Sequence, residues 1–232
     1  ENFVVKEIFS VAQGEGRNVT RGNIGGHQYT TRVELFPFGE FASKGDYKGS
    51  DLKFEQKSKL SLGFAYDFNN NASKTRSNQG SFMYINGTSE GKDAQFYQTN
   101  ISTLFIDAMY KHKGFSFMAE YAKRTAADPL AKNSDDSPLL DSKDKQVAVQ
   151  VGNGLNLQSG YLLSKTVEVS GRYTNISLDK TITGKGAENQ YTLGLSKYIA
   201  GHSLKGQTDV SYTDIGFKTD QLLFRLQVDI HF

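Results

Sequence analysis

The stretch LLFRLQVDIHF at residues 222–232 has the clearest pattern of the chain and decides how the other segments are interpreted. Its apolar residues occupy every second position, and from Arg225 onward the residues between them are polar. Successive side chains of a β-strand point to opposite faces, so the stretch predicts a strand with one apolar face and one polar face. A soluble sandwich would turn the apolar face toward its core, whereas a transmembrane barrel would turn it toward lipid.

Other segments alternate in a similar way, and together they predict about ten strands that follow one another as hairpins. The remaining predicted strands span residues 4–13, 29–36, 60–68, 99–111, 115–124, 146–163, 166–175, 191–198 and 204–212. No helix of useful length is expected. Short turns alternate with longer loops, which is the asymmetry of outer-membrane barrels. Residues 38–59 fall on the side of the short turns, where they are too long, and the pattern does not place them.

Composition narrows the class of protein. The 232 residues contain no long apolar run, which excludes transmembrane helices but not a barrel, whose strands hide their apolarity in alternation. A formal net charge of +2 leaves no electrostatic footprint for nucleic acid. Because cysteine is absent, the chain has neither disulfides nor thiolate chemistry.

Charged residues lie on the predicted polar faces, opposite the apolar stripes. In a soluble sandwich they would be ordinary solvated charges, and in a barrel they would line a water-filled lumen along the path of a solute. The set comprises Arg32, Glu34, Asp67, Glu120, Arg124, Glu168, Arg172, Lys205, Asp209, Arg225 and Asp229. Anion selectivity needs a surplus of cations, whereas these charges are balanced. Pairing between neighbouring strands, which would brace the wall, is therefore expected to explain most of them.

Aromatic residues end the apolar faces of many predicted strands, which favours a barrel because such barrels carry aromatic girdles at both membrane interfaces. They are Tyr29, Phe68, Tyr110, Tyr121, Tyr161, Tyr173, Tyr191 and Tyr212. The last residue, Phe232, closes an alternating strand and resembles the signal that the barrel-assembly machinery reads in bacterial outer-membrane proteins. We therefore expect Phe232 to be an assembly signal.

Several ordered segments resemble the carboxy-terminal half of the phosphate-selective porin O and P family. They are FIDAMYKHKGFSFMAEYAKRTAADP (105–129), LQSGYLLSKTVEVSGRYTNI (157–176) and YTLGLSKYIAGHSLKGQTDVSY (191–212), followed by the closing strand. The segments RVELFPFGEF (32–41) and GDYKGSDLKFEQKSKLSLGFAYDFNNNA (45–72) resemble the Bacteroidetes branch of that family. Each motif alone is weak, and the resemblance rests on their order and spacing.

The resemblance implies an all-β fold, an antiparallel up-and-down transmembrane β-barrel of about sixteen to eighteen strands in the bacterial outer membrane. It implies passive diffusion of small hydrophilic solutes, including anions such as phosphate, with no cofactor. On this interpretation residues 1–232 form a single barrel domain that lacks amino-terminal strands, and a complete ten-stranded barrel is the alternative. The implied partners are outer-membrane lipid, lipopolysaccharide, the barrel-assembly machinery and a homotrimer or larger outer-membrane complex. The arginine ladder and lysine-bearing constriction loop of the family have no match here, so phosphate specificity does not follow.

Two other functions remain open, a structural or plug-type barrel subunit and a barrel-embedded hydrolase that would use Glu120 and Glu168. Wall charges explain those two glutamates equally well, so a non-enzymatic protein is expected. No metal site is expected, because the four histidines are scattered along the chain. The acidic loop around Asp135 and Asp141 lacks the glycine and closing glutamate of a calcium loop.

Overall fold

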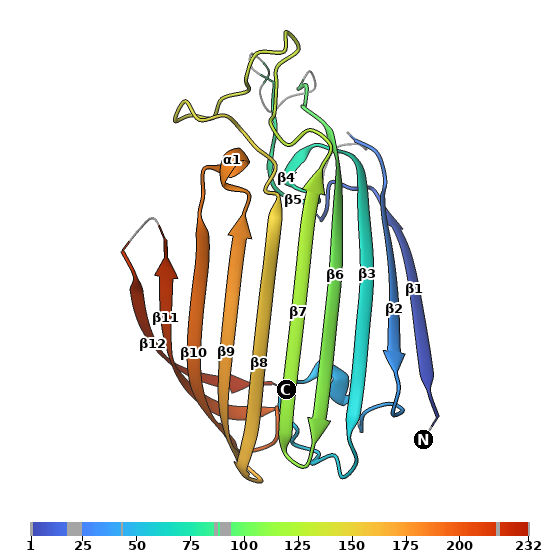
Figure 1. Ribbon diagram of the computed structural model, residues 1–232, viewed down its shortest axis with the longest axis vertical. Helices are drawn as coiled ribbons and strands as arrows, with labels where there is room; N and C mark the ends of the chain where they lie inside the picture. The colour runs from blue at the N-terminus through green and yellow to red at the C-terminus, as the bar shows by residue number, and fades with distance from the viewer. Residues whose placement is uncertain are drawn as a thin grey trace.

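The computed structural model describes residues 2–17, 25–42, 44–85, 88, 94–216 and 219–231, and its main feature is a ten-stranded antiparallel sheet (Figure 1). The strands are β1 (Val4–Ala12), β2 (Gln28–Phe36), β3 (Lys59–Ala72), β6 (Thr99–His112), β7 (Phe115–Ala126), β8 (Gly152–Ser164), β9 (Val167–Leu178), β10 (Ala187–Tyr198), β11 (Leu204–Ile215) and β12 (Gln221–Ile230). Their order in the sheet follows their order in the chain. The predicted all-β, up-and-down arrangement of ten strands is therefore confirmed.

The sheet is curved and open within the described part of the chain. Its outermost strands, β1 and β12, each pair with a neighbour on one side only. Figure 1 shows the lower ends of β11 and β12 sweeping behind β8 and β9, which makes one face of the sheet concave. None of the described helices is long and apolar enough to cross a membrane.

The strand register assigns every residue of the sheet to one of two faces. We call the concave side the inner face and the opposite side the outer face. Arg32 lies opposite Ala65 of β3, which in turn lies opposite Phe105 of β6, and these three share the inner face. The intervening residues, such as Val33 and Ile106, point to the outer face.

The two-residue connection between β6 and β7 shows how the hairpin register is set. Lys113 and Gly114 both have positive φ, 46° and 85°. Two consecutive residues of this kind form a primed turn, whose twist matches that of the paired strands. This fixes the pairing of His112 with Phe115, and with it the face on which each residue of β6 and β7 lies.

At the opposite end of the sheet, two sequence predictions were wrong. The polar connection expected after residue 68 contains the end of β3 and a small hairpin, β4 (Lys74–Arg76) and β5 (Gln79–Phe82). The strand expected from residue 146 begins only at Gly152. The alternating valines before it pack instead into a core that the long loops form with the ends of β3 and β6, made of Ala72, Met83, Ile101, Ala131, Leu139, Val149 and Val151.

Two short helical turns complete the described structure. The helix α1 (Lys180–Thr183) follows β9, and Asp179 caps its first turn by accepting a hydrogen bond from the backbone N–H of Thr181. The 3₁₀ turn η1 (Gly45–Tyr47) lies in the connection between β2 and β3. This second turn belongs to a segment that approaches the inner face.

Candidate functional site

The two faces of the sheet are buried in the opposite sense to those of a soluble protein. On the outer face, Leu226 is 78% exposed, and Phe64 in the middle of the sheet is 43% exposed. On the inner face, Asp67 is 7% exposed and Lys111 only 2%. Lysine and aspartate are almost never this buried unless they are paired, so the inner face must supply their partners.

All the charged residues selected from the sequence lie on the inner face, as the strand registers show. They are Arg32 and Glu34 on β2, Asp67 on β3, Glu120 and Arg124 on β7, Glu168 and Arg172 on β9, Lys205 and Asp209 on β11, and Arg225 and Asp229 on β12. Their contact with a passing solute stays a prediction. Phe232, the expected assembly signal, lies outside the described residues.

The last two strands carry the cross-strand ion pairs that charge balance led us to expect. The Arg225 guanidinium donates to Asp209 across the β11–β12 pair at 2.9 Å. Further along the same pair of strands, Lys205 Nζ lies 3.0 Å from Asp229. These charges therefore compensate one another at one side of the inner face.

Other charged residues of the set find neutral or no partners. Asp67 accepts hydrogen bonds from Gln28 and Thr30, and Tyr198 donates its hydroxyl to Glu168. The Nε atom of Arg172 is buried and has no hydrogen-bond partner among the described residues. Pairing between strands thus explains only part of the predicted set.

The densest charged cluster surrounds Arg32 and includes a residue that the sequence reasoning did not select. The two terminal nitrogens of Arg32 donate to the two carboxylate oxygens of Asp107, at 2.6 and 2.9 Å, and its Nε donates to Glu34 at 2.8 Å. Alternation in β6 could have identified Asp107, because it stands between outer-face apolar residues.

Residues 37–42 and 44–58, in the connection from β2 to β3, lie against the inner face, and we call them the inner segment. Figure 1 draws them in light blue near the foot of the sheet. Their anchors reach several strands: Lys6 of β1 pairs with Glu40 at 2.6 Å, and Lys111 of β6 donates to the backbone oxygen of Ser50 at 2.8 Å. The inner segment also approaches β8 at Gly49, because a Cβ atom added to this glycine would lie only 3.3 Å from the side-chain amide nitrogen of Gln158.

Asp51 is the main anchor of the inner segment at the end of the sheet. It is 1% exposed, and its carboxylate accepts hydrogen bonds from the backbone N–H groups of Glu55 and Gly114, the latter at 2.7 Å. The N–H of Lys113 donates to the backbone oxygen of Glu55. The inner segment is therefore hydrogen-bonded to the β6–β7 turn, at the end of the sheet that the loop parity predicted for it.

His202, in the turn between β10 and β11, lines a cavity of about 280 Å³ beside the inner segment. Burial lowers the pKa of His202 below its usual value of 6.5, and the nearby charges of Lys48, Lys205 and Lys111 lower it further. The imidazole packs edge-on against the ring of Tyr198, with 5.5 Å between the centroids. The neutral form of His202 is thus favoured where this turn meets the inner segment.

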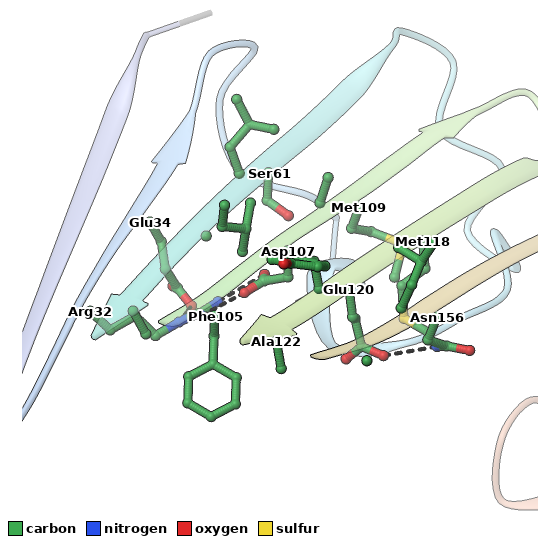
Figure 2. Close-up of a pocket in the computed structure, with 18 of the residues that line it drawn as sticks. Arg32, Glu34, Ser61, Phe105, Asp107, Met109, Met118, Glu120, Ala122 and Asn156 are labelled. Atoms are coloured by element: carbon green, nitrogen blue, oxygen red, sulfur yellow. Dashed lines mark hydrogen bonds and ion pairs between the residues drawn. The ribbon is translucent and has the colours of Figure 1, made fainter. Parts of the chain in front are cut away.

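A cavity of about 620 Å³ lies between the inner face and the inner segment. Figure 2 shows Arg32, Asp107 and Glu120 around it, with Met109 and Met118 beside them. The inner segment contributes Asp46 and Tyr47 to its lining. The cavity combines carboxylates with thioether and aromatic groups, so it can hold a solute that has both a polar and an apolar part.

A scan against protein-family models and a search of the curated proteins gave no match to this chain.

Proposed function

We propose that this chain forms the wall of an outer-membrane β-barrel channel for the passive diffusion of small hydrophilic solutes. The observation that carries the proposal is the contrast between an exposed apolar outer face and a polar inner face that buries charged side chains such as Asp67 and Lys111. A membrane barrel has this arrangement, because its outer face meets lipid and its lumen holds water. The resemblance to the phosphate-selective porin O and P family points to the same function.

The extent of the apolar outer face supports a lipid environment over water. Contiguous apolar patches larger than a few hundred Å² are rare on soluble monomers and mark surfaces that contact a membrane or another protein. Here exposed apolar side chains of the outer face extend from Val5 on β1 through Ile106 on β6 to Phe224 on β12. Transfer of such side chains from water to lipid is favourable by roughly 25 cal/mol per Å².

The two outermost strands support the proposal that the sheet is part of a closed barrel. An exposed sheet edge does not occur within lipid, because its unpaired N–H and C=O groups would have no partners there. The free edges of β1 and β12 would therefore be closed in the membrane, either by each other or by additional strands. The family resemblance favours additional strands, and a trimer or larger assembly.

The selectivity of the channel is a separate matter from its existence. The family resemblance suggests anions such as phosphate, which would need a surplus of cations along the path. The inner-face charges of the last two strands are paired, Arg225 with Asp209 and Lys205 with Asp229. They supply no such surplus.

A second candidate function, a structural or plug-type subunit of a larger outer-membrane complex, is supported by the inner segment. Its anchors at Glu40, Ser50 and Asp51 reach β1, β6 and the β6–β7 turn, so it occupies part of the space that a solute would use. If the inner segment fills the remaining width of the lumen, the barrel would serve as a support rather than as a channel.

Conductance of the purified full-length protein in planar lipid bilayers separates the two functions. We expect stepwise channel insertions with a stable conductance, and heat-denatured protein should give none. Insertion into the bilayer without an open channel at any voltage would reject the channel and favour the structural subunit. Reversal potentials in a salt gradient then give the selectivity.

A further inference from the structure

We propose that the cavity beneath the inner segment binds a small organic cation, an amine or guanidinium on a short aliphatic chain. Its consequence for permeation, a preference for cations over anions at this point, rests on the proposed channel function. The binding itself does not, because it requires only the folded cavity.

The charged residues that line the cavity are mostly acidic. Its lining includes four carboxylates and one guanidinium, a formal net charge of −3. The carboxylates are those of Glu34, Asp46, Asp107 and Glu120, and the guanidinium is that of Arg32. Negative charges on a cavity wall attract a cationic solute and raise its local concentration.

Glu34 supplies the independent observation that a hydrogen-bond donor is missing from the cavity. The residue is 7% exposed, and its Oε1 accepts a hydrogen bond from Arg32. Its Oε2 is buried and has no hydrogen-bond partner among the residues that the structure describes. A buried carboxylate oxygen without a donor is destabilising, and a ligand that brings an N–H group would remove that penalty.

Arg32 donates three of its five N–H groups, and neither of the other two is hydrogen-bonded to this oxygen. Both terminal nitrogens are engaged in the two-pronged contact with Asp107, and the Nε–H is directed at the other oxygen of Glu34. One cation thus serves two carboxylates, and a negative charge remains at the cluster. The bidentate geometry also holds Arg32 in place, so it does not swing over to satisfy Glu34 Oε2.

Glu120 provides a second uncompensated carboxylate on the neighbouring strand. It lies directly opposite Asp107 in the β6–β7 pair. Its Oε2 accepts a hydrogen bond from the neutral side-chain amide of Asn156 at 2.8 Å, which leaves its charge in place (Figure 2). A ligand with two cationic ends could therefore reach both Glu34 and Glu120 within one cavity.

The apolar part of the lining selects an organic cation over a hydrated metal ion. Phe36, Met109 and Met118 line the same cavity and belong to the cluster that the inner segment covers through Phe41. Aliphatic chains pack well against methionine, whose flexible, polarisable side chain adapts to irregular shapes. A hydrated inorganic ion would leave this surface without a contact.

The test is calorimetric titration of the detergent-solubilised full-length protein with agmatine, which carries an amine and a guanidinium on an aliphatic chain. Butyrate serves as the anionic control. We expect agmatine to bind and butyrate not to. The substitution Glu34→Gln removes the charge with little change of shape, and it should weaken agmatine binding about tenfold or more, as expected for a charge-assisted hydrogen bond.

Two further variants keep the test decisive. Glu120→Gln changes an exposed side chain, so it should fold normally and weaken binding by a smaller factor, even where Glu34→Gln is poorly folded. Asp209→Asn neutralises an inner-face carboxylate outside this cavity and should leave binding unchanged. No binding of agmatine, or equal affinity in the wild type and in Glu120→Gln, would overturn the proposal.

Conductance separates a failure of this inference from a failure of the channel. Agmatine binding without any channel would support the cation site and reject the channel. A channel that conducts but does not bind agmatine would reject the cation site alone. If both hold, the reversal potential should show cation preference, and Glu120→Gln should reduce it.

Discussion

The outer and inner faces of this sheet are built from the same strands, residue by residue, yet they meet different surroundings. On β12, Leu226 and Gln227 are neighbours in the chain and point to opposite faces. The outer-face side chain is left exposed by the protein, whereas the inner face carries ion pairs and the inner segment. Neighbouring residues of one strand thus build two faces of different composition, an apolar face that the protein leaves exposed and a polar face that carries the ion pairs.

The largest expected effect comes from placing a charge on the outer face. Leu226→Arg should destabilise the protein by about 2–4 kcal/mol in a bilayer, because the side chain lies in the middle of a strand and would enter hydrocarbon. The free energy of unfolding from lipid vesicles in urea measures this effect. The matched control is Gln227→Arg, one residue away on the inner face, where the cost should be much smaller.

A soluble protein would give the opposite result for the same variant. Leu226 is highly exposed, so Leu226→Arg would change the stability of a soluble sheet by no more than about 0.5 kcal/mol. Equal and small effects of Leu226→Arg and Gln227→Arg would therefore contradict the assignment of the outer face to lipid.

The next effect concerns the attachment of the inner segment. Asp51→Ala leaves the N–H groups of Glu55 and Gly114 without their acceptor, at a cost of about 1–3 kcal/mol. Because the inner segment would be held less firmly, we also expect faster cleavage of it by trypsin and a larger or noisier conductance. Asp144→Ala, in an exposed loop at the other end of the sheet, is the control.

An unchanged cleavage rate in Asp51→Ala would show that other contacts suffice to hold the inner segment. The backbone contact between Lys111 and Ser50 would then be the main attachment. Lys111→Met would test it directly, since this change keeps an unbranched side chain only one atom shorter but removes the donor.

A smaller effect is expected from the ion pairs at the side of the inner face. Arg225 and Asp209 are partly exposed, and such pairs contribute about 0.2–1 kcal/mol. A double-mutant cycle with Arg225→Gln and Asp209→Asn measures their coupling. A coupling well above that range would mean that the two charges brace the wall more strongly than their exposure suggests.

The smallest effect is the pH dependence that His202 contributes. Its pKa is lowered in the folded protein, by burial first and then by Lys48, Lys205 and Lys111, so folding favours the neutral imidazole. The stabilisation is therefore fully present above pH 6.5 and is lost as the pH falls through the lower folded pKa. Unfolding in urea at several pH values should show this loss.

The comparison with His202→Gln isolates this contribution, because the other charged groups that line the same cavity are common to both proteins. They are Lys48, Asp51, Lys53, Glu55 and Lys111. Below pH 6.5 the wild type should lose stability relative to the variant. Parallel pH profiles of the two proteins would show that folding does not change the pKa of His202.

Much of the sheet could be predicted from the sequence, because alternation is a local property. Successive side chains of a strand point to opposite faces whatever lies around them, so the pattern of residues 222–232 was sufficient to place Arg225 and Asp229 on one face. The same rule assigned every member of the predicted charged set, and it could have assigned Asp107.

The segments between strands were predicted less well, because alternation does not indicate which distant residues a segment contacts. Val149 alternates like a strand residue but is buried in the core of the long loops. The inner segment has no regular pattern at all, and its anchor Asp51 finds its donor at Gly114, far along the chain.

The sequence thus determined the strands, their hairpin order and the composition of each face, since these depend on neighbouring residues. The folded structure decided which face is buried, how the inner segment lies against it and which carboxylates share Arg32. Those features depend on contacts between residues that are distant in the chain, and Asp107 meets Arg32 only because β3 brings β2 and β6 together. The folded structure also shows that Oε2 of Glu34 has no hydrogen-bond partner among the described residues, and the proposed cation site rests on this oxygen.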